Sequence, residues 1–502
     1  RHPGESHVTD SDPADASSGI PGLDDVLRGG FARRRLFLIE GDPGAGKTTV
    51  ALQFLLAGVA AGERVLYITL SESEAELRAS ALSHGWSLGG VEVFELVSPD
   101  SLLDEDQQQS LLYSSDLELG ETTRRILEAV ARARPQRIVL DSLSELLLLA
   151  QSPLRFRRQL LAIKHALAAV GATVLVLDDL TSGLADRTLH SLAHGVLRLE
   201  EIAPSYGAGR RRAHVIKYRG RQVRGGFHDL VIATGGLQVF PRLVSAEHRA
   251  SPRREAVSSG TPGLDSLLGG GLDRGASVLV LGPAGAGKSL LTLSVAAAAV
   301  ARGERAALFV FDEEIGLLRD RALGIGIDVA ALEAGGGLML AGVDAAELSP
   351  GEFAHRVRAC VEEGARVVGL DSLNGYQSAM PEEQALILHL HELIQYMNRQ
   401  GVASLVTVAQ HGLVGDMLAP VDVTYLADTV LLMRYFEARG RVRRAMSVLK
   451  KRMGPHEDTI REFRIGAGGF RLGEPLTQFQ GVLRGVPDFA GDPPELLAEG
   501  SA

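Results

Sequence analysis

The chain has 502 residues, of which 45% are hydrophobic and 23% charged, which is enough for two domains with a core each. Its formal net charge of −10 argues against a surface that coats nucleic acid. A lone cysteine, Cys360, excludes an internal disulfide, and no signal peptide or membrane span is visible, so we expect a cytoplasmic protein without a membrane partner.

An internal repeat begins after a polar segment, residues 1–16, that we expect to be disordered. The sequence Ser-Ser-Gly-Ile-Pro-Gly-Leu-Asp at 17–24 returns at 258–265 with one change, 241 residues later. A period this long indicates duplicated domains rather than a solenoid. We predict a first domain over 17–243, a linker over 244–257, a second domain over 258–485 and a flexible acidic tail over 486–502.

Each predicted domain carries a complete phosphate-binding loop, and the two loops are also 241 residues apart. Each follows an apolar run and precedes a helical pattern, as the motif requires. Its glycines let backbone N–H groups surround a phosphate, its lysine contacts the β/γ oxygens and its hydroxyl residue binds Mg²⁺. The predicted nucleotide-binding residues are Gly41, Asp42, Pro43, Gly44, Ala45, Gly46, Lys47, Thr48 and Thr49, then Gly282, Pro283, Ala284, Gly285, Ala286, Gly287, Lys288, Ser289 and Leu290.

Strand patterns alternate with helical patterns in each half. Continuous Val, Leu and Ile runs favour a mostly parallel sheet that is covered on both faces. Residues 196–240 are richer in strand pattern and are expected to add antiparallel strands. The fold class is therefore α/β, present twice. In the first half the expected strands are 35–40, 64–70, 137–140, 173–177, 195–199 and 213–217, and the expected helices are 48–61, 121–132 and 154–170.

Carboxylates at strand ends are candidates for metal binding and catalysis. Asp141 and Asp371 each end an apolar strand and precede Ser-Leu, which fits a carboxylate that holds Mg²⁺ together with Thr48 or Ser289. Glu72 and Glu313 follow the strand after each phosphate-loop helix and could orient a water in line with the γ-phosphate. The alternative is that they are first-turn residues of the next helix.

Two basic clusters follow late strands, at Lys217-Tyr-Arg219 and Lys450-Lys-Arg452. They are either a solvated or phosphate-contacting face, or cationic fingers that reach a neighbouring subunit's γ-phosphate. In the second case the active site lies between subunits.

Together these residues resemble the circadian-clock KaiC family and its bacterial relatives, from about Ser17 to Leu483. The resemblance implies two RecA-like P-loop domains in a homo-hexameric double ring that binds ATP with Mg²⁺ between subunits and hydrolyses it slowly. It implies autophosphorylation by the second domain in some members, and a clock or signalling protein as partner. By position, Lys217, Arg219, Lys450 and Arg452 would be the trans fingers, and Glu72 and Glu313 the second members of catalytic carboxylate pairs.

Three departures from the family pattern matter. The usual Glu-Glu pair is Ser71-Glu72 in the first half, which predicts weaker hydrolysis there, and Asp312-Glu313 in the second, where Asp312 could still act through a water. The phosphorylated Ser-Thr pair aligns with Thr424-Tyr425, so Thr424 is the candidate phosphoacceptor, the alternative being a strand-edge threonine. The tail does not resemble the loop that recruits the clock protein's activating partner.

Two other functions remain open at this stage. A DNA-dependent RecA/RadA-like motor would need residues 207–214, which are rich in Gly and Arg, as a channel loop, although Glu200 and Glu201 dilute its charge. A nucleotide-gated scaffold would need binding without hydrolysis. The polar segment 95–120 is a candidate docking site for a partner.

Overall fold

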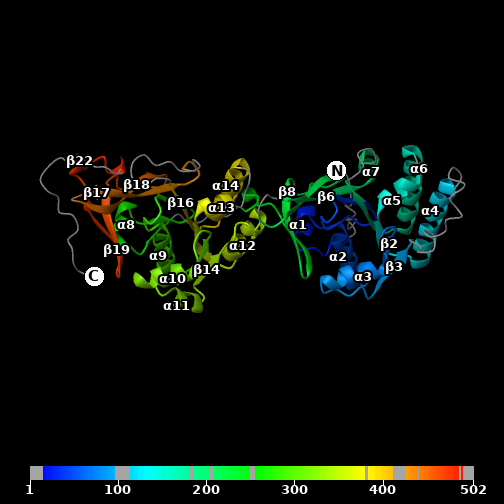
Figure 1. The fold of residues 1–502 in the computed structure, drawn as a ribbon, viewed down its shortest axis with the longest axis horizontal. Coiled ribbons are helices and arrows are strands. Elements are labelled where there is room, and N and C mark those ends of the chain that lie inside the picture. The colour runs from blue at the N-terminus through cyan, green and yellow to red at the C-terminus, as the bar shows by residue number, and fades with distance from the viewer. Residues whose placement is uncertain are drawn as a thin grey trace, which may run out of the picture. The chain divides into compact units, whose positions relative to one another are not determined.

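The computed structural model describes residues 15–96, 114–150, 152–180, 186–203, 207–248, 255–378, 383–410, 424–438, 440–484 and 488–489. They form two compact units that divide between Arg242 and Leu243 (Figure 1). Of the N-terminal segment, the structure describes Asp15, which pairs with Arg221 at 2.6 Å, and Ala16, which is buried. Most of the expected tail and the centres of the linker and of segment 95–120 lie outside the described residues.

The first unit is built on a nine-stranded sheet in the order β3-β2-β4-β5-β1-β6-β7-β8-β9. Strands from β3 to β6 in this order pair in parallel, and β7 to β9 add antiparallel strands. The strands are β1 Leu36–Gly41, β2 Val65–Thr69, β3 Val91–Glu95, β4 Arg137–Asp141, β5 Thr173–Asp179, β6 Gly195–Ile202, β7 Arg210–Tyr218, β8 Phe227–Ala233 and β9 Gly236–Phe240. The helices are α1 Leu23–Leu27, α2 Lys47–Ala60, α3 Glu74–Ser83, α4 Ser114–Ala133, α5 Leu143–Ala150, α6 Pro153–Val170 and α7 Asp186–Leu192.

The second unit repeats this plan in the order β14-β13-β15-β16-β12-β17-β18-β19-β20. Its strands are β10 Ala256–Val257, β11 Leu272–Asp273, β12 Ser277–Gly282, β13 Arg305–Val310, β14 Leu338–Gly342, β15 Ala365–Asp371, β16 Ala403–Ala409, β17 Thr429–Ala438, β18 Arg441–Lys451, β19 Arg461–Gly466, β20 Gly469–Pro475, β21 Phe479–Gln480 and β22 Asp488–Phe489. Its helices are α8 Pro262–Leu267, α9 Lys288–Ala301, α10 Ile315–Gly324, α11 Val329–Ala334, α12 Pro350–Glu362, α13 Leu373–Ser378 and α14 Glu383–Arg399, with short 3₁₀ turns at Ser245–Glu247 and Val482–Arg484.

Burial on both faces explains the continuous apolar strands. In β1, Phe37 and Ile39 belong to the core that α2 covers, whereas Leu38 belongs to the core that α4 to α6 cover (Figure 1). Because both faces are covered, these strands need no polar face. The predicted α/β class, present twice, is confirmed. None of the helices in the described ranges has the length and apolar character needed to cross a bilayer.

Two similar stretches, Arg137-Ile-Val-Leu-Asp141 and Arg366-Val-Val-Gly-Leu-Asp371, suggest that Arg137 and Arg366 are equivalent, but the strand register shows that they are not. Val65 pairs with Arg137 in the first sheet, and its counterpart Ala306 pairs with Val367 in the second. The residue of the second unit that is equivalent to Arg137 is therefore the buried Val367, whereas Arg366 is exposed.

A buried histidine in the first unit predicts pH-dependent stability. His228 is fully buried, with its Nε2 donating to the Arg224 carbonyl at 3.0 Å and its Nδ1 accepting from the Arg242 N–H at 2.9 Å. Burial lowers its pKa to about 4. The unfolded chain binds the proton from about pH 6.5, so the first unit should lose about 3 kcal/mol of stability as pH falls from there to about 4.

The sole tryptophan, Trp86, packs against the first unit's core, so its fluorescence during denaturant unfolding reports this unit. A His228→Gln variant keeps an amide donor and acceptor but cannot titrate, and its stability should change less over the same pH range. Identical pH profiles for the two proteins would contradict the prediction.

Candidate nucleotide-binding sites

Each phosphate loop joins the end of a central strand to a long helix. β1 ends at Gly41 and α2 begins at Lys47; β12 ends at Gly282 and α9 begins at Lys288. The residue before each helix has a left-handed backbone, with φ of 104° at Gly46 and 105° at Gly287. This backbone conformation strains any residue other than glycine, and a Cβ on Gly46 would also lie 2.7 Å from the side chain of Ile232.

The loops have the donors that a phosphate chain requires. Lys47 Nζ donates to the carbonyls of Gly41 and Asp42 at 2.8 and 2.9 Å, and Lys288 Nζ donates to the equivalent carbonyls of its loop at 3.0 and 2.8 Å. Each ammonium group is thus held over its loop, and burial lowers the pKa of Lys288. A pocket of about 300 Å³ lies beside the second loop and is lined by Gly285, Gly287, Lys288, Ser289, Leu290, Arg321, Arg444 and Ile465.

The two strand-end aspartates lie one strand removed from the phosphate-loop strand, on β4 and β15. Asp141 is buried and accepts from the Tyr67 hydroxyl at 2.6 Å, whereas Asp371 accepts from the Thr407 hydroxyl. Burial, helped by the charge of Asp179, raises the pKa of Asp141 against the opposing effects of Tyr67 and Lys47. Each half therefore fixes this carboxylate with a hydroxyl group, but from a different neighbouring strand.

The predicted water-orienting glutamates lie near these aspartates. Burial and the charge of Asp141 raise the pKa of Glu72. Burial also raises the pKa of Glu313, and the charge of Asp371 adds to this while Arg321, 2.6 Å away, opposes it. Electrostatic coupling of each glutamate to the aspartate of its own half is what a shared catalytic centre requires.

The residue before each glutamate differs between the halves. Asp312 accepts a hydrogen bond from Ser372, which directly follows Asp371, and lines a pocket of about 530 Å³ together with Glu313, Glu314 and Asp344. Ser71, at the same place in the first half, is exposed and carries no charge. At this position the second site therefore has a carboxylate where the first site has a neutral serine.

The basic clusters lie at the opposite end of each sheet from the phosphate loop. In the first unit, Gly195 pairs both with Phe37, near the start of β1, and with Tyr218, at the end of β7. In the second, Val278 near the start of β12 pairs with Thr429, which pairs with Lys451. At about 3.3 Å per residue, roughly 13 Å of strand separates each cluster from its own loop.

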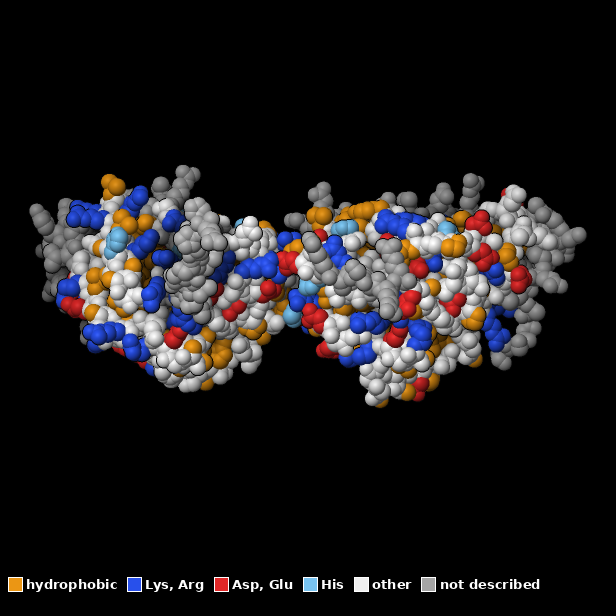
Figure 2. All heavy atoms as spheres, turned by 180° about the vertical axis from the view of Figure 1, so that it is seen from behind, with side chains coloured by type: hydrophobic (Ala, Val, Ile, Leu, Met, Phe, Trp, Pro, Cys, Tyr) orange, Lys and Arg blue, Asp and Glu red, His pale blue; other side chains and the backbone are white. Residues whose placement is uncertain are grey.

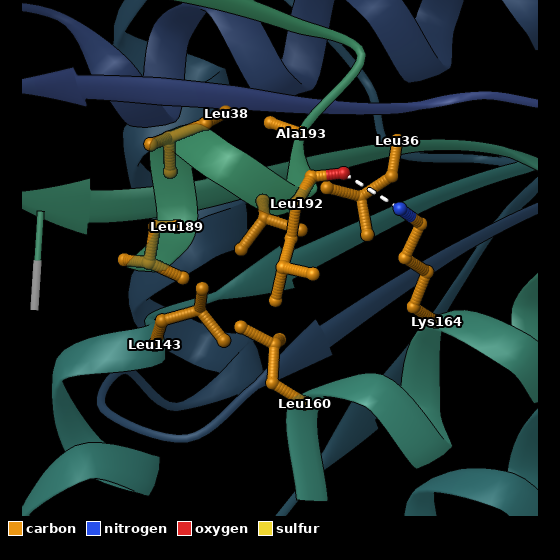
Figure 3. A pocket seen from close by; sticks show the side chains of 9 residues that line it. Leu36, Leu38, Leu143, Leu160, Lys164, Leu189, Leu192 and Ala193 are labelled. Carbon is orange, nitrogen blue, oxygen red and sulfur yellow. Dashed lines mark hydrogen bonds between the residues drawn. The ribbon is translucent and has the colours of Figure 1, made fainter. Parts of the chain in front are cut away.

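Within the first unit these cations bind the C-terminal carbonyls of α7. Lys217 donates to His190 and, at 2.8 Å, to Ala193, while Arg219 donates to Ser191 at 2.7 Å. Lys164 of α6 donates to the Leu192 carbonyl at 2.7 Å, at the rim of a small apolar pocket between these helices (Figure 3). Burial and neighbouring cations lower the pKa values of Lys217 and Lys164.

The second unit repeats this arrangement around Thr424. Lys450 donates to the carbonyls of Thr424 and Ala427 at 3.0 and 2.8 Å, and Arg452 donates to the carbonyl of Tyr425 at 2.8 Å. Thr424 lies in a turn before β17 and is partly exposed. The candidate phosphoacceptor is therefore attached through its backbone to the candidate finger Lys450.

The segment that a DNA motor would need as a loop is mostly strand. Arg211 and Arg212 lie in β7 and pair with Glu201 and Glu200 at 2.9 and 2.7 Å. On the face seen in Figure 2, basic side chains are interspersed with acidic and hydrophobic ones. This arrangement weakens the positive field that DNA binding requires.

Sequence reasoning missed three residues in these sites: Tyr67, Thr407 and Asp179. Asp179 ends β5 and lies 2.7 Å from Lys47. Tyr67 and Thr407 sit inside apolar strands, and no local motif marks either of them. Asp179 could have been found, because two successive aspartates at the end of an apolar strand, Asp178 and Asp179, are visible in the sequence.

Comparison with known proteins agrees with this geometry. A family model described as ATPase: KaiC matches residues 16–244 and again 257–477. The chain is 28% identical over 481 residues to the circadian clock protein KaiC3 of Synechocystis sp., a match that covers 94% of each protein. It is 27% identical over 480 residues to the circadian clock oscillator protein KaiC of Parasynechococcus marenigrum, covering 94% of this chain and 92% of that protein. For KaiC of Thermostichus vulcanus the identity is 27% over 481 residues, covering 93% and 90%. Since the family model matches most of the chain in two repeats, the chain belongs to the KaiC family of ATPases.

Proposed function

We propose that each half hydrolyses ATP at a site shared between two copies of the chain. One observation carries this proposal: the phosphate loop and carboxylates lie at one end of each sheet, and the Lys/Arg pair lies at the other. No pair can reach the loop of its own half across the sheet, whereas it can meet the loop of a neighbour. Head-to-tail contacts of this kind close into rings, and the family resemblance favours a double ring of six chains.

The chain's own residues divide the chemistry as follows. Lys47 and Lys288 would contact the β/γ-phosphates, and the neighbour's Lys/Arg pair would stabilise charge on the transferring group. Glu72 and Glu313 would accept a proton from the attacking water. The donor sets Thr48 with Asp141 and Ser289 with Asp371 fit Mg²⁺, which when bound neutralises phosphate charge. Asp312 gives the second half the more complete carboxylate set, so we expect faster hydrolysis there.

We further propose that Thr424 accepts a phosphoryl group from a neighbour's ATP. Lys450 holds the Thr424 carbonyl, so a Lys450 that approaches the neighbour's γ-phosphate brings the Thr424 hydroxyl toward it. The relatives named above are clock proteins, and we propose a timing or signalling role in the cytoplasm with a protein partner.

Incubation with Mg²⁺ and γ-labelled ATP tests both activities at once. We expect free labelled phosphate together with label on the protein, because water and the Thr424 hydroxyl compete for one γ-phosphate. Thr424→Ala should lose the protein-bound label and keep phosphate release, whereas the matched Tyr425→Phe variant should keep both. A Lys47→Ala/Lys288→Ala variant should show neither.

The possible failures are distinct. Label that persists in Thr424→Ala would move the phosphoacceptor elsewhere, and phosphate without any label would leave an ATPase only. Nucleotide binding with neither product would favour the nucleotide-gated scaffold, and hydrolysis that rises steeply with DNA would favour the motor.

A further inference from the structure

The phosphate-loop lysine of the first half has a carboxylate partner at a position that is alanine in the second half. Lys47 Nζ lies 2.7 Å from Asp179 Oδ1, in addition to the two loop carbonyls that it contacts. Asp179 ends β5, and its backbone pairs in register with Gly41, where the loop begins.

Strand register identifies the equivalent position in the second half. Gly282, the counterpart of Gly41, pairs with Ala409 at the end of β16. Alanine carries no charge there, and Lys288 is held by the carbonyls of Gly282 and Pro283. The same loop is therefore built with an anionic neighbour in one half and without it in the other.

This carboxylate opposes nucleotide binding in two ways. Lys47 must leave Asp179 before it can contact a phosphate, so the ion pair competes with the nucleotide for the ammonium group. The negative charge of Asp179 also repels phosphate oxygens at the loop. The Lys47 side chain is 11% exposed and that of Asp179 is 37% exposed, so water screens the pair in part.

We propose that Asp179 is a latch on Lys47 that weakens nucleotide binding at the first phosphate loop and has no counterpart at the second. The latch rests on the proposed nucleotide binding, but it adds a means of setting the affinity of one half independently of the other. Half-filling the first loop then takes a higher nucleotide concentration than the same loop would need without Asp179.

The rival interpretation is that Asp179 belongs to the catalytic centre and supplies the carboxylate that Ser71 lacks. Asp179 neighbours Asp141 on the adjoining strand, so it could instead support Mg²⁺. The two interpretations predict opposite effects on affinity: loss of a latch tightens binding of the Mg²⁺–nucleotide complex, whereas loss of a metal-supporting carboxylate weakens it.

The test measures binding of a fluorescent, non-hydrolysable ATP analogue with Mg²⁺ to the full chain carrying Lys288→Ala, so that only the first loop reports. Asp179→Asn keeps the side-chain shape but removes the charge, and we expect binding about three- to tenfold tighter. The gain should shrink at high salt because a partly exposed ion pair is screened. Unchanged or weaker binding overturns the latch, and weaker binding supports the metal role.

A transplant provides the matched control. In a Lys47→Ala background, where only the second loop reports, Ala409→Asp places a carboxylate at the equivalent position and should weaken analogue binding by a similar factor. Tighter or unchanged binding would contradict the latch. If neither loop of the unaltered chain binds the analogue, the proposed function fails together with the latch; if both bind and only the variants show no effect, the latch alone fails.

Discussion

Chains that lack Lys217 and Arg219 are expected to hydrolyse ATP about 10²- to 10³-fold more slowly at the first site, because cations that stabilise the transferring phosphoryl group contribute on this scale. The measurement is phosphate release by a Lys217→Ala/Arg219→Ala variant. The measurement is made in an Asp312→Asn/Glu313→Gln background, which we expect to abolish hydrolysis by the second half while its phosphate loop stays unchanged.

Mixing two inactive variants then tests where the site lies. Chains with Glu72→Gln should also be inactive, because they keep the loop and fingers but lose the base. A site in a mixed ring is complete when one chain offers an intact Glu72 and its neighbour intact fingers, so an equal mixture should recover about a quarter of the first-site activity. A mixture that stays inactive after subunit exchange would place the whole site in one chain.

Lys164 supplies the control for a purely structural effect. It donates to the same C-terminal end of α7 as Lys217 and Arg219, but from α6. If the fingers matter only because they hold α7, Lys164→Ala should reduce hydrolysis similarly. We expect Lys164→Ala to reduce ATP hydrolysis only slightly, because Lys164 is not one of the proposed fingers.

The largest expected change in stability is at Arg137. Its side chain is 2% exposed, forms an ion pair with Glu63 and donates to the carbonyls of Ser17 and Phe54 at 2.7 and 2.8 Å. Burial raises the pKa of Glu63, but hydrogen bonds and charges from Arg137 and Arg33 outweigh it and hold the pKa below its usual value. Arg137→Met would leave Glu63 and two carbonyls without these donors, so we expect a loss of about 3–5 kcal/mol.

Denaturant unfolding followed by Trp86 fluorescence measures this loss in the first unit. The double variant Arg137→Met/Glu63→Leu should be less damaging than the single one, because it also removes the carboxylate that would otherwise keep only Arg33 as its charged partner. Arg366→Met is the control in the second unit, where unfolding is followed by far-ultraviolet circular dichroism because Trp86 reports only the first unit; the exposed Arg366 side chain should contribute under about 0.5 kcal/mol. If Arg137→Met changed the stability of the first unit as little as this, the prediction would be wrong, and water would be replacing the hydrogen bonds that Arg137 donates.

The sequence carried enough signal to predict the α/β class, the duplication and the family. Those predictions used local patterns: apolar strands, a glycine-rich loop and a helix in fixed order. The roles of Glu72, Glu313, the four finger cations and Thr424 stay predictions. In the structure, the charge of the aspartate in each half contributes to raising the pKa of the glutamate of that half.

What the sequence could not reveal depends on strand order. Asp179 reaches Lys47 only because β5 lies between β4 and β1, and residues so far apart in the chain carry no shared motif. The hydroxyl groups that bind the two strand-end aspartates also depend on strand order. Tyr67 reaches Asp141 from the strand on one side, whereas Thr407 reaches Asp371 from the strand on the opposite side. The similar stretches that begin at Arg137 and Arg366 differ in length by one residue, so only the register of β15 shows that Val367, not Arg366, is equivalent to Arg137.

The contacts of Lys217 and Arg219 with the end of α7 have a consequence for communication within an assembly. In an isolated chain these cations satisfy carbonyl groups of α7. If the proposed site between subunits forms and a neighbour's ATP draws the cations away, those carbonyls are left to water and the last turn of α7 should loosen. Hydrogen exchange at α7 in one subunit would then depend on the nucleotide occupancy of the next subunit, so each site of the proposed ring would report its state to its neighbour without any contact between the nucleotides.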